Sequence, residues 1–269
     1  MIVSGMADYS WHKRSYQNKK QNKTHAMLQC VLPATLCVLL IVIVWKKWQL
    51  FLQSFVWWLV EFASADPKHP VIHFEEPRPC LEDIRNNLAS IQREISASLP
   101  CADDIQDDGF FNRTITNDRR WKKIFLKWYA KSPAYAYRLF PVTMAVIDRH
   151  SDVRLAMVSV LQPGAKVHPH CGPYRGSIRV HVSVQTPNSS QCYIEVGGQR
   201  YSYMDSNIVA FDDTYEHSVA NNTNRSRIVL FLDIDRRMKY MWAQTILKCV
   251  SYLIGTTMPQ HVNTNINHK

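Results

Sequence analysis

The sequence lacks the cysteine spacings of a zinc finger or a dithiol redox motif. Its seven cysteines form no C-x-x-C pair and no zinc-finger pattern along 269 residues. Internal repeats and low-complexity tracts are also missing. Because 46% of the residues are hydrophobic and 11% are aromatic, the chain can bury a sizeable core, which excludes a disordered polypeptide.

A motif for binding nucleic acid is missing as well, although the chain is basic. Lysine and arginine number 32 against 22 aspartates and glutamates, which gives a formal charge of +10. These cations are spread along the sequence and accompany no RNA- or DNA-binding motif. We therefore expect no nucleic-acid partner and attribute the basic bias to a nearby anionic membrane.

Charge is absent from residues 26–45, AMLQCVLPATLCVLLIVIVW. A helix of this length, at about 1.5 Å per residue, crosses a hydrocarbon core of roughly 30 Å. No small-residue cleavage site follows in the right place, so we expect a retained transmembrane anchor. More cations precede the run than follow it, which predicts a basic cytoplasmic tail over residues 1–25 and a catalytic domain in the ER or secretory lumen. The flanking cations are Lys13, Arg14, Lys19, Lys20 and Lys23 before the run and Lys46 and Lys47 after it.

Residues 46–79 are expected to connect the membrane to a soluble domain. The segment WQLFLQSFVWWLV, residues 48–60, is too short to span a bilayer and rich in tryptophan. It suits the membrane interface, or else it prolongs the anchor helix. Four prolines between Asp66 and Pro79 predict a linker. The soluble domain is then expected over residues 80–237, followed by a C-terminal helix and tail over 238–269.

The soluble domain is expected to begin with an amphipathic helix, because apolar residues recur at steps of three and four. These residues are Leu81, Ile84, Leu88, Ile91 and Ile95. Cys80 and Cys101 bracket this pattern and are either a disulfide in an oxidising compartment or two free thiols. After an acidic loop, RRWKKIFLKWYA (119–130) alternates basic and aromatic residues. It predicts a substrate or headgroup surface, or an ordinary half-buried strand.

After Arg154 the pattern changes to period two with many β-branched residues. The strand-like segments are LAMVSVLQ, SIRVHVSV, CYIEVGGQRYSYM, NIVAFDD and RIVLFLDID. Short strands at near-regular spacing, with turns between them, predict an all-β sandwich or jelly roll. The expected fold is therefore mainly β, a double-stranded β-helix with flanking helices after a transmembrane helix. Residues 236–254 predict a basic amphipathic helix that touches the membrane or packs on the domain.

Two histidines lie at strand ends in turn-rich surroundings, His170 in HPHCGPY and His217 in FDDTYEHSV. In a jelly roll, strands far apart in sequence meet at one mouth, so both imidazoles can reach one ion. Arg227 opens the last apolar strand, and a buried guanidinium requires an anionic partner. Two imidazoles, an arginine and open coordination positions are what a non-haem iron oxygenase that uses 2-oxoglutarate needs.

Five segments together resemble the aspartyl/asparaginyl β-hydroxylases and their bacterial relatives, the lipid A acyl 2-hydroxylases. The resemblance covers roughly residues 70–237 and keeps the family's order and spacing. The segments are RRWKKIFLKWYA, HPHCGPYRGSIRVHVSVQTPN, CYIEVGGQRYSY, FDDTYEH and RIVLFLDIDR. The resemblance implies a dioxygenase that uses Fe(II), 2-oxoglutarate and O2, and that hydroxylates its substrate while 2-oxoglutarate is decarboxylated to succinate.

Position by position, the resemblance places the two iron ligands, which are also the catalytic residues, on His170 and His217. It places the 2-oxoglutarate contacts on Ser159, Arg179, His181 and Arg227, with Arg227 as the principal carboxylate clamp. His168 is left as a rim or structural residue.

The carboxylate that many such oxygenases carry two residues after the first histidine is missing, because Gly172 stands there. The resemblance implies that the peptidyl hydroxylases share this glycine, so the gap favours that branch. Nearby acids at 212, 213 and 216 are expected to orient His217 rather than to bind metal. A zinc site of His168, His170 and Cys171 is possible only in a tight turn.

The substrate is left open between two chemistries. Several segments look more like the lipid A hydroxylases, whereas a luminal domain agrees with the peptidyl enzymes. Five N-x-S/T sequons, at Asn22, Asn112, Asn188, Asn221 and Asn224, also fit a secretory lumen. We expect peptidyl Asp/Asn side chains ahead of an acyl chain, with a protein or lipid substrate near the bilayer. The second alternative is a jelly-roll binding module that has lost its chemistry.

Overall fold

The computed structural model describes residues 47–48, 50–102, 120–129, 131–204 and 207–257. The chain divides into two compact units, Met1–Leu52 and Gln53–Lys269. The predicted anchor over 26–45 lies outside the described residues, as do the sequons at Asn22 and Asn112. Within the described ranges, no helix has the length and apolar character needed to cross a bilayer.

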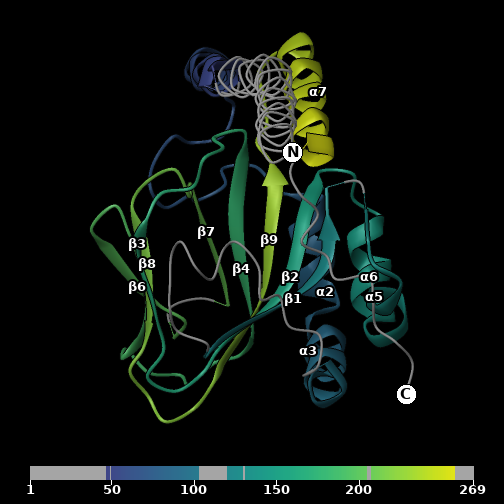
Figure 1. The fold of residues 1–269 in the computed structure, drawn as a ribbon, viewed down its shortest axis with the longest axis vertical. Helices are drawn as coiled ribbons and strands as arrows, with labels where there is room; N and C mark the ends of the chain where they lie inside the picture. Colours follow the sequence, from purple (N-terminus) through teal and green to yellow (C-terminus); the bar gives the residue numbers. More distant parts are fainter. Residues whose placement is uncertain (1–46, 49, 103–119, 130, 205–206, 258–269) are drawn as a thin grey trace, which may run out of the picture. The chain divides into compact units, whose positions relative to one another are not determined.

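The second unit contains two antiparallel sheets (Figure 1). The larger has the strand order β1-β2-β9-β4-β7, and the smaller has the order β3-β8-β5-β6. From β2 to β9 successive strands belong alternately to the larger and the smaller sheet, except that β5 and β6 are both in the smaller one. This is the strand order of a jelly roll, so the mainly β prediction is confirmed. The strands are β1 (Trp121–Trp128), β2 (Val153–Leu161), β3 (Lys166–His170), β4 (Ser177–Gln185), β5 (Cys192–Val196), β6 (Gln199–Ser202), β7 (Ile208–Phe211), β8 (His217–Asn221) and β9 (Arg227–Asp235).

Alternation along the strands gives the larger sheet two different faces. In β4 the odd positions 179, 181 and 183 are polar, while Ile178, Val180, Val182 and Val184 belong to the main hydrophobic core. Helices cover this apolar face (Figure 1). They are α2 (Pro79–Asn86), α3 (Leu88–Ser98), α5 (Ala134–Leu139) and α6 (Pro141–Asp148). The polar face of β4 is therefore left to the space between the two sheets.

The single helix predicted after residue 80 is two helices. Asn87 separates α2 from α3, and its side-chain amide donates to the carbonyl and the carboxylate of Asp83. Such local bonds compete with the helical pattern. Leu81, Ile84 and the two later isoleucines of the stripe are buried as predicted. A short 3-10 turn, Leu99–Ala102, follows α3.

Residues 66–79, predicted as a linker, pack against the domain. The Ile72 N–H donates to the Ala210 carbonyl at 2.9 Å, and the Asp212 N–H donates to the Pro70 carbonyl at 3.0 Å. Val71 forms an isolated bridge with Phe211 of β7. These bonds protect an otherwise open sheet edge.

The structure also shows which cysteines and which sequon asparagines of the described ranges are buried and which are exposed. Cys80 is buried and Cys101 exposed, and both are free thiols. Asn188 and Asn224 are exposed. Asn221 is fully buried, and its amide donates to three backbone carbonyls, so the fold excludes a glycan there.

The C-terminal helix α7 spans Met241–Thr257. It packs on the domain through Ala243, Leu247 and Val250, which are buried. Its first turn exposes Met241 and Trp242. The sequence left open whether this helix touches the membrane or packs on the domain. The buried residues show that it packs on the domain, and contact with a membrane stays a prediction.

Candidate active site

The two histidines singled out in the sequence are direct neighbours across two strands. His170 ends β3, His217 begins β8, and the two residues are paired in register. Side chains of directly opposed residues lie on the same face of a sheet, and the ring centroids are 4.2 Å apart. The pairing of β3 with β8 thus brings together two imidazoles that are 47 positions apart in the sequence.

Hydrogen bonds set the orientation of both rings. Nδ1 of His170 lies 2.7 Å from the His168 carbonyl, and Nδ1 of His217 lies 2.9 Å from the Tyr215 carbonyl. A carbonyl only accepts, so each Nδ1 carries the proton and each Nε2 keeps its lone pair. Burial lowers the pKa of His217 to about 3 and also lowers that of His170. Both rings are therefore neutral, as metal binding requires.

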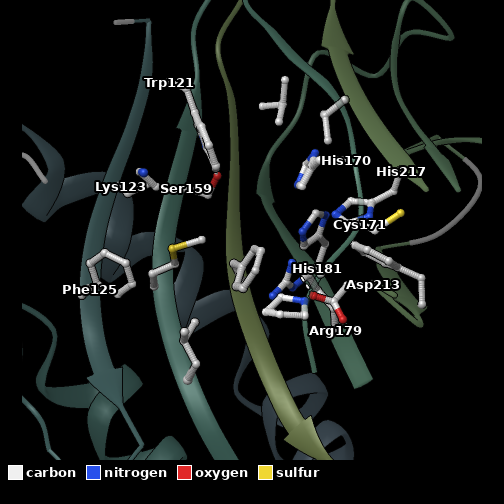
Figure 2. A pocket seen from close by; sticks show the side chains of 18 of the residues that line it. Trp121, Lys123, Phe125, Ser159, His170, Cys171, Arg179, His181, Asp213 and His217 are labelled. Atoms are coloured by element: carbon white, nitrogen blue, oxygen red, sulfur yellow. Dashed lines mark hydrogen bonds and ion pairs between the residues drawn. The ribbon is translucent and has the colours of Figure 1, made fainter. Parts of the chain in front are cut away.

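The histidine pair borders a pocket of about 240 Å³ between the sheets. All six predicted site residues line it: Ser159, His170, Arg179, His181, His217 and Arg227. Figure 2 shows Ser159 and Trp121 on strands facing the two histidines. Trp121 Nε1 donates to Ser159 Oγ at 3.0 Å, which leaves the serine O–H as a donor for a ligand. The strand β1 also contributes Lys123, whose ammonium lies 4.4 Å from the Trp121 ring centre.

Arg227 brings a buried positive charge to this pocket. Its Nη2 donates to the Tyr203 hydroxyl at 2.8 Å, and Tyr203 also lies 3.0 Å from Nδ1 of His181. In the described part of the chain no carboxylate pairs with Arg227, and its Nε and the Nε2 of His181 have no hydrogen-bond partner. Burial, followed by the charge of Arg227, lowers the pKa of His181 well below its usual value. A buried cation without a counter-ion calls for an anionic ligand.

Arg179, the other predicted carboxylate contact, is already paired. It lies opposite Asp233 in the register of β4 and β9, and its Nε and Nη2 donate to that carboxylate at 2.9 and 3.1 Å. Its Nη1 lies 3.0 Å from Asp213. Burial opposes its charge, yet the two carboxylates outweigh burial and raise the pKa of Arg179. Arg227 is therefore the cation better placed to receive a ligand.

The space beside Gly172 is filled by a carboxylate from another loop. A Cβ at position 172 would lie 1.9 Å from Oδ2 of Asp213, and the Gly172 N–H donates to the Asp213 carbonyl at 2.7 Å. Asp213 is buried, and burial raises its pKa to about 7. The glycine is thus a packing requirement, because the loops that carry His170 and His217 touch here.

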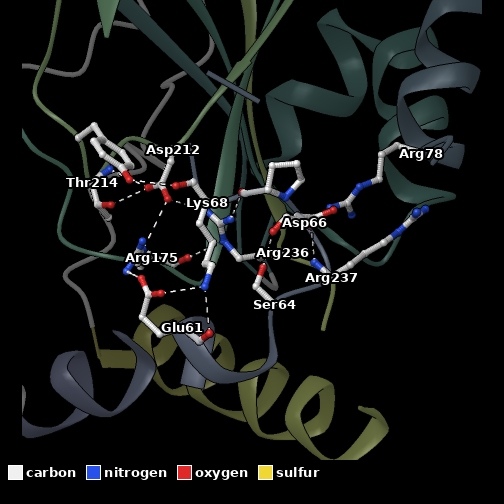
Figure 3. Close-up of polar contacts among 12 residues, drawn as sticks. Glu61, Ser64, Asp66, Lys68, Arg78, Arg175, Asp212, Thr214, Arg236 and Arg237 are labelled. Atoms are coloured by element: carbon white, nitrogen blue, oxygen red, sulfur yellow. Dashed lines mark hydrogen bonds and ion pairs between the residues drawn. The ribbon is translucent and has the colours of Figure 1, made fainter. Parts of the chain in front are cut away.

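An ion-pair network joins both loops to residues 53–63, the part of the preceding helix that belongs to the second unit (Figure 3). Arg175, five residues after His170, contacts Glu61 of that helix and lies 3.7 Å from Asp212. Asp212 accepts from Arg236 at 2.6 Å. The acidic residues near His217 therefore have different roles, since Asp212 and Asp213 form ion pairs and Glu216 is exposed.

The structure does not bring His168, His170 and Cys171 together as the alternative zinc site would require. His168 is exposed and contributes only its carbonyl to His170, and Cys171 is exposed at the edge of the pocket. Throughout the described ranges, no three metal-ligating side chains gather at one point. The side chains that could hold a metal at this point are the two imidazoles.

The remainder of the pocket wall is apolar. Phe125 and Trp128 come from β1, Leu155 and Met157 from β2, and Phe231 from β9, and all belong to one buried cluster. The bulge between Phe125 and Lys127 in β1 keeps both aromatic rings on this side. Phe125 and Trp128 lie in the segment 119–130 that the sequence suggested as a substrate or headgroup surface or a half-buried strand. Tyr203, Asp233 and the rest of this wall were not identified from the sequence.

Comparison with known proteins places these residues in a family. The model of the aspartyl/asparaginyl β-hydroxylase family matches residues 85–237, more than half of the chain. The chain belongs to this family. The resemblance seen in the five sequence segments is thereby confirmed, and both histidines and Arg227 lie within the match.

Individual relatives differ in how much they share. An ornithine lipid ester-linked acyl 2-hydroxylase from Rhizobium tropici is 28% identical over 70% of this chain and 69% of its own length. Mouse aspartyl/asparaginyl β-hydroxylase is 24% identical over 42% of this chain, and the match spans only 16% of the mouse protein. Among solved structures, a Trichoplax adhaerens prolyl hydroxylase aligns at a TM-score of 0.39 with 12% identity, covering 62% of this chain and 93% of that one.

Proposed function

We propose that this hydroxylase-family chain is an Fe(II)- and 2-oxoglutarate-dependent dioxygenase. The observation that carries the proposal is the pairing of two neutral imidazoles with an unpaired buried cation in one pocket. His170 and His217 offer their Nε2 atoms to a metal, and Arg227 offers a guanidinium to a carboxylate. Iron with 2-oxoglutarate would supply the activation of O2 that converts a C–H bond to C–OH as the keto acid becomes succinate and CO2.

The chain's own residues orient the co-substrate and keep water out. Arg227 is held by Tyr203, and the Ser159 hydroxyl is free to donate. The ring of His181 lies between Phe211 and Phe231, and its centroid is 5.1 Å from the centroid of each of these rings. Burial lowers the pKa of His181, so the ring stays neutral. An arginine in a dry pocket binds a carboxylate more strongly than it would in water.

Substitution of each histidine tests the metal site. His170→Ala and His217→Ala should abolish iron-dependent succinate release, whereas His168→Ala, on the same strand with an exposed ring, should retain it. Turnover of 2-oxoglutarate in either of the first two variants would disprove the assignment. A chain that binds Fe(II) but releases no succinate would favour the non-catalytic binding module.

We further infer that the substrate is an acyl chain rather than a peptidyl Asp or Asn. Phe125, Trp128, Leu155, Met157 and Phe231 form an apolar wall that a hydrocarbon suits and a carboxylate does not. The Rhizobium tropici relative, which matches over 69% of its own length, is also an acyl 2-hydroxylase. This order reverses the expectation from the sequence, in which peptidyl substrates came first.

Mass spectrometry distinguishes the two substrates. Lipids from cells that express the chain should gain the mass of one oxygen atom on an acyl chain, and peptides should not. The variant Met157→Gln, similar in volume but polar, should lower lipid hydroxylation while substrate-independent succinate release remains. Oxygen gained only on Asp or Asn peptides would refute the acyl proposal and leave the dioxygenase intact.

We also propose that residues 26–45 anchor the protein in a membrane, with the catalytic domain in the secretory lumen. The uncharged run and its flanking cations support this placement. Asn188 is exposed and is the sequon that tests it. We expect a glycan on Asn188 that is lost in the variant Asn188→Gln. An unmodified Asn188 would count against the lumen.

A further inference from the structure

Two segments far apart in sequence lie side by side outside the region of the family match. Ser64, just after the helix of residues 53–63, forms a bridge with Met238, just before α7. The Ala65 N–H donates to the Arg237 carbonyl at 2.9 Å, and the Lys239 N–H donates to the Ala63 carbonyl at 2.7 Å. These bonds fix the end of one helix against the start of the other.

This contact between the two helix ends brings together a row of exposed aromatic side chains. We name this row the aromatic face, and its members are Trp58, Phe62, Tyr240 and Trp242. The rings of Trp58 and Phe62 are 5.7 Å apart and nearly parallel, and Phe62 lies 6.1 Å from Tyr240 and 6.4 Å from Trp242. Each remains exposed, Trp58 and Phe62 at 56%, Tyr240 at 46% and Trp242 at 48%. Contiguous exposed apolar surface of this kind marks an interaction site.

The chemistry of the aromatic face matches a lipid bilayer interface. Tryptophan and tyrosine combine an apolar ring with a polar group, so they favour the headgroup level of a membrane. Lys239 and Lys248 are exposed on the same segment and α7, where they complement anionic headgroups. In sequence, the uncharged run of residues 26–45 ends eight positions before residue 53. A bilayer is therefore the occupant that both composition and chain order favour.

The aromatic face is also connected to the rim of the pocket. The loop over residues 171–176 lines the pocket through Cys171, Gly172 and Pro173. The same loop contacts α7, because the Tyr174 hydroxyl lies 2.8 Å from that of Ser251. The loop over residues 171–176 would thus connect a membrane bound to α7 with the pocket that contains His170 and His217.

We propose that the aromatic face docks on anionic lipid and holds the pocket against the bilayer surface. This docking is separate from any anchoring by residues 26–45, and it does not depend on the dioxygenase chemistry. It assigns a role to α7 and to the helix over 53–63, which the family match over residues 85–237 does not include.

Photo-crosslinking in the full-length chain tests the proposal. The photoreactive residue p-benzoylphenylalanine would replace Trp242, or in a second protein Tyr137, which is exposed to a similar degree on α5. Both proteins carry the same residues 26–45, so tethering alone affects them equally. In phosphatidylcholine vesicles containing phosphatidylserine, irradiation should attach lipid at position 242 and not at position 137.

The controls keep each outcome informative. Lys239→Glu with Lys248→Glu should lower the lipid adduct at position 242 in vesicles with phosphatidylserine to the yield in phosphatidylcholine alone. Circular dichroism establishes that each variant is folded, and exposed positions of this kind tolerate substitution. Equal lipid adducts at both positions, adducts only to protein when cell membranes are irradiated, or no adduct at position 242 would each overturn the proposal.

Discussion

Adding a single methyl group at Gly172 should damage this site. The backbone there does not have a positive φ, so alanine is not excluded by backbone conformation. The obstacle is Asp213, since the new Cβ would lie 1.9 Å from its Oδ2 and 2.3 Å from its Cγ. Asp213 cannot withdraw freely, because Oδ2 lies 3.0 Å from Nη1 of Arg179.

The loss of stability in Gly172→Ala depends on how far Asp213 must move to make room for the new Cβ. Overpacking a filled site costs about 1–3 kcal/mol, and breaking the buried Arg179–Asp213 pair would cost about 3–5 kcal/mol. For a domain of this size each kcal/mol lowers Tm by roughly 2–4 °C. At about 3 kcal/mol, where these two ranges meet, Gly172→Ala should lower Tm by roughly 6–12 °C. It should also reduce succinate release, because both histidine loops meet at this contact.

The assay is thermal unfolding followed by succinate release, with His168→Ala as the neighbouring control. That side chain is exposed, so its loss should change stability by less than about 0.5 kcal/mol. Gly172→Asp, which restores the carboxylate that is missing from the sequence, should be at least as harmful as Gly172→Ala. Combining Gly172→Asp with Asp213→Gly moves the carboxylate from one loop to the other and should recover most of the lost Tm.

Two results would refute this reasoning. One is a Gly172→Ala protein with unchanged Tm and turnover, which would mean that Asp213 does not occupy the space. The other is additive behaviour of Gly172→Asp and Asp213→Gly, since residues in direct contact should couple by more than about 0.5 kcal/mol.

Other perturbations have outcomes that the same geometry determines. Tyr203→Phe removes the acceptor for Arg227, and a hydrogen bond to a charged group is worth about 1.5–3 kcal/mol, so the Kd for 2-oxoglutarate should rise roughly tenfold or more in calorimetry. Arg227→Lys keeps the charge but loses the planar fork and should weaken binding similarly. Fe(II) should raise the Tm of the wild type and not that of His217→Ala, and a chelator should reverse the rise. Iodoacetamide should spare Cys80 in the folded chain, where burial raises its pKa to about 12, and modify it after unfolding, as peptide mass spectrometry would show.

Period-two patterns predicted the long strands well because each of them has one apolar face against the helices. The strands β3 and β8 were not predicted, although they carry the two histidines. Each has five residues, and β3 contains Pro169 and is mostly exposed. β3 is an edge strand and β8 lies between β3 and β5, but both are too short to give the alternating signal of a half-buried strand. The sequence could place His170 and His217 at strand ends but could not show that they face each other in register.

The supporting residues were harder to find for a related reason. Asp233 lies six positions after Arg227 on β9, on the same face at spacing two, so alternation alone could have drawn attention to it. Its partner depends on the register between β4 and β9, which no local pattern encodes. Tyr203 lies just after β6 and reaches Arg227 only because the smaller sheet folds over the larger one.

The pairing of Arg179 also gives the two ends of the pocket different chemistry. At the histidine end, Arg179 is already paired with Asp213 and Asp233, so the groups left for a ligand there are the two neutral imidazoles. At the other end, Arg227 has no carboxylate partner among the described residues, so an anion is favoured. A ligand with a metal-binding head and a remote carboxylate can satisfy both ends in only one orientation. The proposed co-substrate 2-oxoglutarate has this property, so loss of Arg227, rather than of Arg179, should remove the proposed preference for a dicarboxylic keto acid.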